Sequence, residues 1–297
     1  MRVTGLFLYP VKSLRGHAVP VAEFDALGFL GDRRFLVVDP TGKFMTQRTA
    51  PRLACIDARL SAGWLTLSAD GAGSVAISTA ARADAPLRTV SVWKSEGLQA
   101  EDCGPAAAGW LSSFLQVECH LGRIGAQFSR PILKPSARPG DVVSFADSHP
   151  FLAISEASLA DLNDRIQENH GEPVPMNRFR PNLVVDGGDA FAEDAWTRLR
   201  IGDAVFRNGG PCARCIVTTT DQFSGERTGK EPLKTLATFR RDAADPTDVN
   251  FGVNLIHETK HGTIRVGLVV AKRKQCTDRI IGAGGSAEAS AGWCTAH

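Results

Sequence analysis

The amino-acid sequence predicts an α+β protein dominated by strands, with a β-barrel domain in its N-terminal part. Two observations support this. Residues 2 to about 94 consist of short strand-like runs separated by turn signals, and helical periodicity occurs at only three later places. Closely spaced runs without a long helix between them favour antiparallel pairing in a small barrel or sandwich. In chain order, the runs are VTGLFLYP, HAVPVAEFDA, RRFLVVD, LACIDARL, GWLTLSA, SVAIS and RTVSVWK.

The second half of the chain mixes helices with strands. AAAGWLSSFL, residues 106–115, is the first segment expected to be helical, Ser155 can cap a second helix, and Pro232 can start a third. Apolar residues fall on one face in the last two helices: Leu159, Leu162 and Ile166 in one, and Leu233, Leu236 and Phe239 in the other. The strand-like segments are NLVVDG, RLRIGDAVFR, IVTTTD, VNLIHE and TIRVGLVV.

Two stretches interrupt this pattern. Residues 129–140 are rich in proline and end at Gly140, which predicts a linker or an exposed loop over a site. From Ala271 onward, small residues and glycines predominate, which predicts a mobile tail. We therefore expect an N-terminal domain at residues 1–122, a second domain at residues 123–271 and a disordered tail at residues 272–297.

Composition limits the classes of partner. The 297 residues include 34 Lys and Arg against 32 Asp and Glu, so the net charge would not attract nucleic acid or an anionic membrane. The apolar stretch at the N-terminus is too short for a secretory signal, and no segment approaches the ~20 apolar residues of a membrane span. Seven scattered cysteines do not resemble a secreted disulfide scaffold. We expect a cytoplasmic protein with reduced thiols.

The sharpest local motif is GGPCARC at residues 209–215, where Cys212 and Cys215 have CxxC spacing. A structural zinc site would need a second ligand pair, but the only later cysteines lie in or beside the expected tail. A thioredoxin-type pair should open a helix, whereas here the β-branched run IVTTT follows. Two other interpretations remain. One is a single thiolate ligand to a soft transition metal beside the guanidinium of Arg214; the other is a buried pair of small hydrophobic residues.

Four basic residues occur in turn contexts: Lys12, Arg33, Arg48 and Arg180. Singly, such residues are typical of solvated surface. Beside Gly, Pro and Ser turns, they are also what an anion-binding site would use. The sequence has no GxGxxG after a strand, no Walker loop, no GxSxG and no HExxH, and the histidines are isolated. His149 is accordingly interpreted as structural rather than catalytic.

Eight motifs, taken in order, resemble the MOSC family and in particular the mitochondrial amidoxime-reducing component and its bacterial relatives. The resemblance extends from residue 3 to about residue 270 and implies an N-terminal MOSC β-barrel domain followed by a MOSC β-barrel domain with flanking helices. The motifs are YPVKSLRG, GDRRFLVVD, TQR, FLAISEASLADLN, NRFRPNLVVDG, AWTRLRIGD, CARCIVTTTD and KEPLKTLATFR.

The resemblance also implies a cofactor, a mononuclear molybdenum held by the dithiolene of one pyranopterin. Cys215 would be the protein ligand to the metal, and Cys212 matches a family cysteine that does not bind it. Ser155, as a helix cap, would direct the positive end of its helix toward the cofactor phosphate. The cofactor contacts carried over from the family are Lys12, Ser13, Arg33, Ser155, Arg180, Asn182, Ala213, Arg214 and Asn254.

By this resemblance, the protein reduces N-oxygenated substrates such as amidoximes, hydroxylamines and N-hydroxylated bases by oxygen-atom transfer to molybdenum. No iron–sulfur cluster is expected, because the C-terminal end offers only Cys276 and Cys294. Electrons would come from a separate ferredoxin- or flavoprotein-type donor. The main alternative is a sulfur carrier or sulfurtransferase with a persulfide on Cys215, since MOSC domains resemble part of the cofactor sulfurases. A plain binding module is the third possibility.

Overall fold

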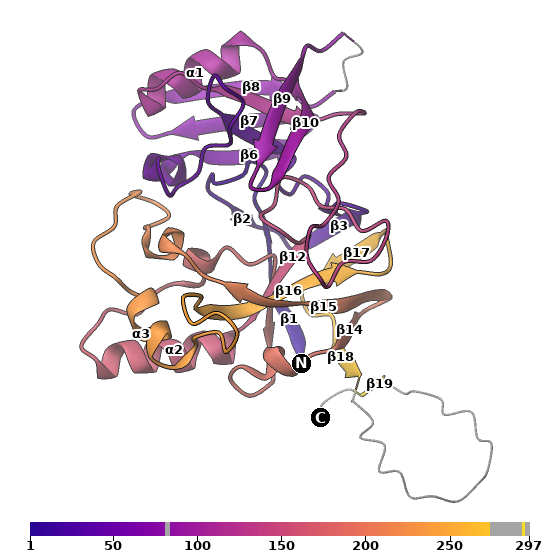
Figure 1. Ribbon diagram of the computed structural model, residues 1–297, viewed down its shortest axis with the longest axis vertical. Helices are drawn as coiled ribbons and strands as arrows, with labels where there is room; N and C mark the ends of the chain where they lie inside the picture. Colours follow the sequence, from indigo (N-terminus) through magenta and orange to yellow (C-terminus); the bar gives the residue numbers. More distant parts are fainter. Residues whose placement is uncertain (81–83, 274–292, 295–297) are drawn as a thin grey trace, which may run out of the picture.

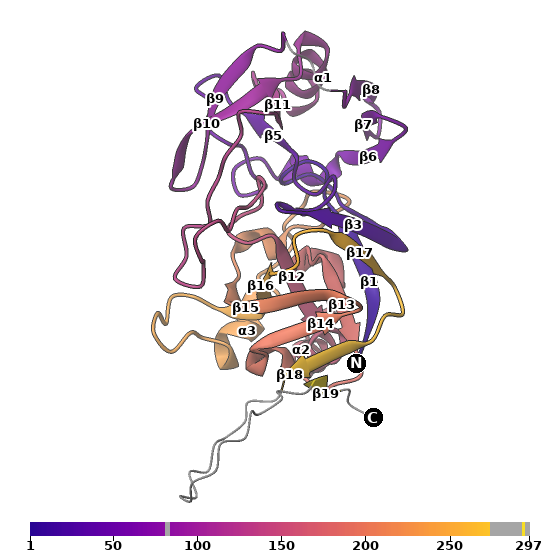
Figure 2. The ribbon, with the colours of Figure 1, turned by 90° about the vertical axis from the view of Figure 1, so that its right-hand side faces the viewer.

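The chain folds into two lobes, stacked along the long axis of the molecule (Figure 1). The computed structural model describes residues 1–80, 84–273 and 293–294. The N-terminal lobe contains η1, α1 and the strands from β5 to β11, and the C-terminal lobe contains the other helices and strands. Curled antiparallel sheets dominate both lobes (Figure 2), so the predicted strand-dominated α+β class is confirmed.

The N-terminal lobe contains a four-stranded sheet, in the order β5-β11-β10-β9, and a three-stranded sheet, in the order β6-β7-β8. Helix α1 begins at Pro105, whose fixed φ suits the first turn. It buries Ala107 and Leu111 in an apolar cluster with both sheets. The element bounds are β5 (Phe35–Val38), η1 (Pro51–Cys55), β6 (Asp57–Ser61), β7 (Trp64–Ala69), β8 (Gly73–Ser78), β9 (Leu87–Val92), β10 (Ser95–Asp102), α1 (Pro105–Leu115) and β11 (His120–Ile124).

The C-terminal lobe is organised around a nine-stranded sheet in the order β19-β18-β14-β15-β16-β12-β13-β1-β2. A smaller sheet has the order β17-β3-β4. The strands of these two sheets have the bounds β1 (Arg2–Leu8), β2 (His17–Ala18), β3 (Val21–Asp25), β4 (Gly28–Phe29), β12 (Phe151–Ser155), β13 (Leu183–Asp186), β14 (Arg198–Ile201), β15 (Ala204–Ala213), β16 (Asn250–His257), β17 (Gly262–Arg265), β18 (Val270–Arg273) and β19 (Trp293–Cys294).

The helices of the C-terminal lobe follow the predicted pattern. Ser155 caps α2, and Leu162 and Ile166 pack in an apolar cluster with Phe179 and Phe251. Among the described residues, no helix is long and apolar enough to cross a membrane. The helical bounds are α2 (Glu156–Glu168), η2 (Met176–Phe179), η3 (Ala192–Ala195), η4 (Ile216–Thr219) and α3 (Leu233–Phe239).

The predicted strand IVTTTD is wrong. Its first four residues form the 3-10 helix η4, although β-branched side chains favour strands. The Thr218 hydroxyl donates to the carbonyl of Cys215 at 2.9 Å, and the Thr219 hydroxyl donates to that of Ile216 at 2.8 Å. These local side-chain bonds support the turn against the strand preference.

The N-terminal strands belong to the C-terminal lobe. Strand β1 pairs with β13, and β3 pairs with β17, so strand pairing crosses the expected domain boundary at residue 122. The boundary itself stays a prediction. Of the expected tail, residues 272–273 continue β18, and residues 293–294 form β19 beside it. The rest of that prediction lies outside the described residues.

Candidate cofactor-binding site

A cavity of about 840 Å³ is lined by residues of both lobes. Its volume lies in the range of small-molecule and cofactor sites, about 300–1,000 Å³. Nine of the ten residues predicted for the site line it together, although they come from segments far apart in the sequence. They are Lys12, Ser13, Arg33, Arg180, Asn182, Ala213, Arg214, Cys215 and Asn254.

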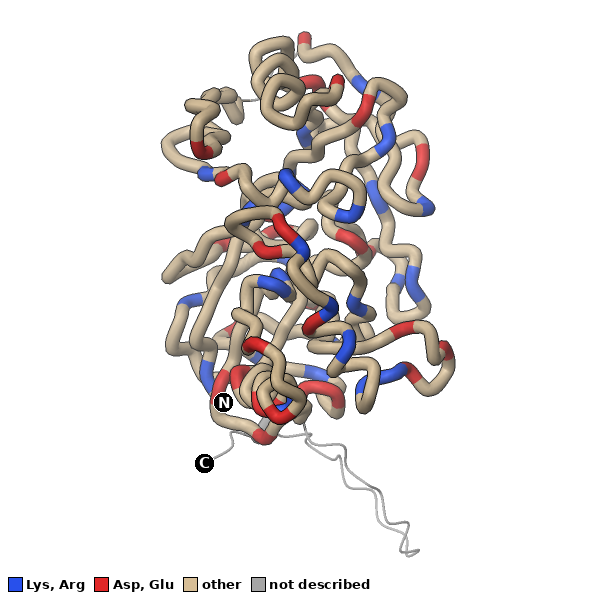
Figure 3. Tube along the Cα trace, turned by 90° about the vertical axis from the view of Figure 1, so that its left-hand side faces the viewer, with Lys and Arg blue, Asp and Glu red and all other residues tan. Residues whose placement is uncertain are grey.

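The cavity is strongly basic, whereas the whole chain is nearly neutral. Nine lysines and arginines line it against three aspartates, Asp147, Asp242 and Asp248. Elsewhere, basic and acidic positions are mixed along the chain, and several basic positions lie where the lobes meet (Figure 3). Because the cations share a partly enclosed space, their field is weakly screened and favours an anion.

The loop that carries Cys215 is shaped by the irregular end of β15. The pairing of β15 with β16 shifts register twice, at Asn208/Gly210 and at Pro211/Ala213. Gly210 has φ of 105°, which suits glycine, and its N–H donates to the Asn208 carboxamide at 2.6 Å. These bulges bend the strand end and turn the cysteine loop toward the cavity.

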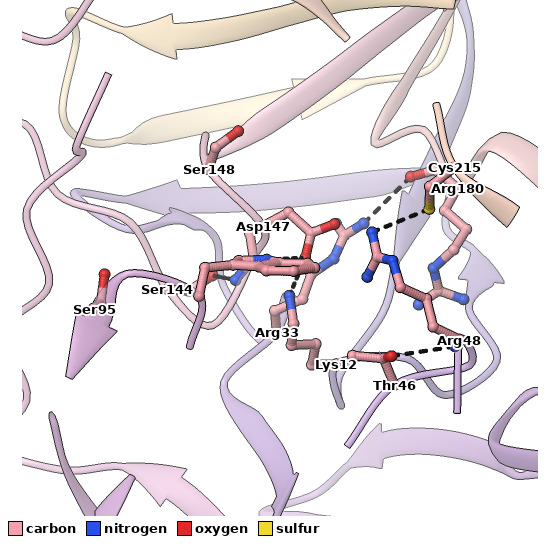
Figure 4. Close-up of polar contacts among 12 residues, drawn as sticks. Lys12, Arg33, Thr46, Arg48, Ser95, Ser144, Asp147, Ser148, Arg180 and Cys215 are labelled. Carbon is pink, nitrogen blue, oxygen red and sulfur yellow. Dashed lines mark hydrogen bonds and ion pairs between the residues drawn. The ribbon is translucent and has the colours of Figure 1, made fainter. Parts of the chain in front are cut away.

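Each cysteine of the motif accepts a hydrogen bond from its own arginine. Arg48 Nη2 donates to Cys215 Sγ at 3.0 Å, and Arg214 Nη1 donates to Cys212 Sγ at 2.8 Å. Both thiols are free and half-buried. Figure 4 shows the Arg48 side chain reaching across to Cys215. A partly exposed sulfur beside a guanidinium is thus available to a ligand in the cavity.

Tyr9 organises two of the cavity arginines. The guanidinium carbons of Arg33 and Arg180 lie 4.2 and 4.4 Å from its ring centroid. The Tyr9 hydroxyl donates to the carbonyl of Pro181 at 3.0 Å, and burial raises the pKa of Tyr9 to about 12. Burial lowers the pKa of Arg180 to about 10, which still leaves it charged at neutral pH. Two cations are therefore held side by side.

Lys12 is buried and paired with Asp147, and the two side chains point toward one another in Figure 4. Burial lowers the pKa of Lys12 to about 8, although the neighbouring carboxylate opposes this shift. Desolvation would raise the pKa of Asp147, but the charge of Lys12 and its hydrogen bond hold it below the usual range. The pair is therefore ionised at neutral pH.

Three predicted contact residues adopt left-handed backbone conformations. Ser13, Arg33 and Arg180 have φ of 68°, 47° and 57°. A non-glycine residue in this region is strained by about 1–2 kcal/mol. Such strain gathers at ligand sites, where the surrounding structure fixes it.

Two asparagines link the cavity wall to the sheet. The Asn182 carboxamide accepts from Arg33 Nη1 at 3.0 Å and donates to the carbonyl of Phe7 at 3.3 Å. Asn254 donates to the carbonyl of Pro211 at 3.0 Å, beside the cysteine loop. Both side chains fix neighbouring segments as well as lining the cavity.

Ser155, the tenth predicted contact, is not among the residues that line the cavity. Ser155 is buried at the start of α2, where its hydroxyl accepts from the Ser158 N–H at 3.0 Å. The Ser158 hydroxyl in turn donates to the Glu193 carboxylate at 2.7 Å. Ser155 was recognised correctly as a helix cap, but the cap serves the interior of the lobe.

Sequence reasoning missed several residues that line the cavity. Arg130 donates to the carbonyls of Ser144 at 2.8 Å and Asp147 at 2.9 Å, which holds the loop bearing Asp147 and Ser148. Trp93 donates to the Asp147 carboxylate at 3.1 Å. None of these residues lies in a motif with a local chemical signature. The one useful signal was the proline-rich stretch 129–140, which was predicted to be a linker or an exposed loop over a site; its residues 130, 131 and 133–136 line this cavity.

His149 lies between two serine hydroxyls at the cavity wall. Its Nδ1 is 2.8 Å from Ser148 Oγ, and its Nε2 is 3.2 Å from Ser136 Oγ. Burial and the charges of Lys134 and Arg207 lower its pKa to about 4, so the ring is neutral at pH 7. His149 therefore does not add to the positive charge at neutral pH.

The described protein side chains at the cavity do not form a metal site by themselves, so a metal there would need further donor atoms from a bound cofactor. In the described part of the chain, no group of three or more His, Cys, Asp and Glu is placed to bind a metal ion. The sulfurs of Cys212 and Cys215 are the soft donors that line the cavity.

Two domain families match the chain. The MOSC N-terminal beta barrel domain matches residues 1–118, and the MOSC domain matches residues 140–271. The fold and the cavity between its lobes thus define a two-lobed MOSC-domain protein.

Three curated relatives specify the class further. Mitochondrial amidoxime-reducing component 1 from Homo sapiens is 36% identical, covering 89% of this chain and 81% of the relative. The protein of that name from Mus musculus is 37% identical, over 89% and 80%, and component 2 from Bos taurus is 35% identical, over 89% and 81%. The chain belongs to this family, the amidoxime-reducing components of the MOSC type.

Proposed function

We propose that the protein is a molybdenum-dependent reductase of N-oxygenated compounds such as amidoximes, hydroxylamines and N-hydroxylated bases. The observation that carries the proposal is the cavity, where the half-buried sulfur of Cys215 lies among nine cationic side chains. The names of the relatives support the reductive activity.

The residues present fit a pterin cofactor with an anionic phosphate. Molybdenum binds thiolate, and phosphate binds guanidinium and ammonium groups. The cavity supplies both donor types, the sulfur of Cys215 and the cationic groups of Lys12, Arg33 and Arg180. When bound, the molybdenum centre would supply the two-electron chemistry that removes oxygen from nitrogen.

The protein's residues would bind and orient the cofactor and shield it from water. Lys12, Arg33 and Arg180 would neutralise the phosphate, with Tyr9 keeping the two arginines together. Ser13, Asn182, Ala213, Arg214 and Asn254 would contact the rest of the pterin. Trp93 and Leu133 line the cavity and are 45% and 59% exposed, so they offer apolar surface to a substrate. Cys215 would hold the metal. The redox chemistry itself would belong to the cofactor.

Electrons would come from a separate ferredoxin- or flavoprotein-type donor. The cytoplasmic location remains a proposal, and the relatives are named as mitochondrial. No nucleic-acid or membrane partner is proposed.

A reduction assay with matched variants tests the proposal. Protein made in a host that synthesises the cofactor, supplied with a chemical reductant, should convert benzamidoxime to benzamidine. Cys215→Ala should abolish conversion, because the metal loses its protein ligand. Intact mass spectrometry provides the contrasting outcome: one added sulfur on Cys215, with no pterin and no reduction, would replace the proposal with the sulfur-carrier function.

A further inference from the structure

Arg48 connects the N-terminal lobe to the proposed metal ligand. The residue lies in a turn closed by the Arg48 N–H, which donates to Thr46 Oγ1 at 3.1 Å. Its guanidinium lies 4.5 Å from the ring centroid of Trp93 and donates to Cys215 Sγ at 3.0 Å. The charged group thus contacts the face of the Trp93 indole and, at its edge, the Cys215 sulfur. Figure 4 shows the contact with the sulfur.

A second arginine, Arg227, donates hydrogen bonds to the backbone of the turn that bears Arg48. Its Nη2 donates to the carbonyl of Gln47, and both Nη atoms lie 3.4 Å from the carbonyl oxygen of Arg48. Its Nε donates to Thr220 Oγ1 at 2.9 Å, which ties the guanidinium to its own lobe just after η4. One planar fork therefore joins the turn that bears Arg48 to the lobe that bears Cys215.

A buried amide pair reinforces this junction. Gln47 Nε2 donates to Gln222 Oε1 at 3.1 Å, and Gln222 Nε2 donates back to Gln47 Oε1 at 3.0 Å. Both side chains are almost fully buried, so separating them would leave unpaired amides in the interior. The position of the Arg48 turn is accordingly fixed by residues 220–227.

We propose that Arg48 tunes the Cys215 sulfur as a metal ligand, and that Arg227 is a positioning residue that acts by holding Arg48. The inference rests on the proposed function, since it concerns the metal that Cys215 would hold. A cation beside the thiolate ligand stabilises the more electron-rich, reduced metal and thereby raises its midpoint potential. A residue that only holds the two lobes together would not change the midpoint potential of the metal.

Arg15 offers a matched control for that distinction. It also bridges the lobes through carbonyls: Nε donates to those of Ala54 at 3.3 Å and Gln222 at 3.0 Å, and Nη2 to those of Cys55 and Phe223. Unlike Arg227, it donates no side-chain hydrogen bond to residues 46–49 in the described part of the chain. Arg15→Ala should therefore destabilise the junction without altering the metal.

The experiment is a redox titration of the bound metal, followed by electron paramagnetic resonance, on molybdenum-loaded protein. Arg48→Ala should shift the midpoint downward, and Arg48→Lys, which keeps the charge but not the fork, should shift it less. Arg227→Ala should shift it in the same direction as Arg48→Ala. The double variant should match Arg48→Ala alone, because Arg227 acts through Arg48. Arg15→Ala should leave the midpoint unchanged.

Three results would overturn the inference: an unchanged midpoint in Arg48→Ala, additive shifts in the double variant, or a shift in Arg15→Ala equal to that in Arg227→Ala. If an alanine variant fails to fold, Arg48→Lys and Arg227→Lys still provide the comparison, since both must shift the midpoint downward. Wild-type protein that binds no molybdenum would contradict the proposed function instead, so the two failures are distinguishable.

Discussion

Lys12 and Asp147 form an ion pair whose two halves differ sharply in exposure: the lysine side chain is 5% exposed and the aspartate side chain 62%. The ammonium therefore has little access to water except through the cavity, whereas more than half of the aspartate side chain is exposed. An anion entering the cavity meets a buried cation that is paired with Asp147, in a region where Arg33 and Arg130 add further positive charge.

This pairing predicts that anion binding depends on pH. In cofactor-free protein, the affinity for a phosphate monoester such as phenyl phosphate should fall as pH rises through about 8, because Lys12 then loses its proton. Lys12→Met should remove a charge-assisted hydrogen bond of about 1.5–3 kcal/mol, which weakens binding roughly 10- to 100-fold. Calorimetric titration between pH 7 and 9.5 measures both effects. Equal pH dependence in the variant would assign the titration to another group.

The role of Ser155 as the cap of α2 gives a second prediction. Ser155→Ala should lower stability by about 1 kcal/mol, the usual value of a helix N-cap, because the Ser158 N–H loses its acceptor. Cofactor content should stay at the wild-type level, since Ser155 does not line the cavity. Urea unfolding and pterin fluorescence after release test the two parts. A stable variant that lost its cofactor would restore the original assignment.

His257 predicts a loss of stability in acid. Its ring is fully buried against Phe24 and Phe151, and burial, with the charge of Lys260, lowers its pKa to about 4. The unfolded chain takes up this proton near the ordinary value of 6.5 and the folded chain only near 4. Unfolding therefore consumes a proton, and stability falls as pH drops from 6.5 to 4, by about 3 kcal/mol in total.

His257→Gln keeps a donor for the carbonyl of Asp25 without the titration. Its urea midpoint should fall less steeply over this pH window than that of the wild type. The remaining slope should include His149, whose pKa is also lowered by burial. Parallel pH profiles for variant and wild type would show that His257 is not the responsible group.

Gly209 predicts a steric limit at the cysteine loop. An added Cβ would lie 2.7 Å from His149 Cδ2 and 3.2 Å from the carbonyl oxygen of Asn254. Gly209→Ala should therefore destabilise the protein by about 1–3 kcal/mol, as overpacking does. Gly109→Ala is the control, because α1 leaves open space there and alanine favours a helix by about 0.5–1 kcal/mol. Thermal unfolding should move in opposite directions for the two variants.

The spacing of apolar residues along the sequence was the most reliable predictor of the fold. Leu162 and Ile166 fall on the buried face of α2 as their spacing indicated, and Ser155 caps that helix. The segment after Cys215 was predicted wrongly, because strand preference was weighed without the hydroxyl bonds of Thr218 and Thr219 to nearby carbonyls. The pairing of β1 with β13 could not be predicted, since it depends on contacts far apart in the sequence.

The site was predictable only where residues belong to motifs. Lys12, Arg33 and Arg180 were singled out by turns and by resemblance, and they line one cavity. Arg130, Asp147 and Trp93 gave no such signal, because their importance comes from bonds to each other and to loops of the other lobe. Arg48 was noticed as a basic turn residue, but its bond to Cys215 crosses 167 sequence positions.

The central claim is that Cys215 holds a molybdenum centre in the basic cavity. The most direct measurement is metal analysis by mass spectrometry of protein purified from a host that makes the cofactor, compared among wild type, Cys212→Ala and Cys215→Ala. The account predicts roughly one molybdenum per chain in the first two and little in Cys215→Ala, because a thiolate ligand is lost with that residue. Metal-free wild-type protein that still reduces amidoximes, or undiminished molybdenum in Cys215→Ala, would contradict it.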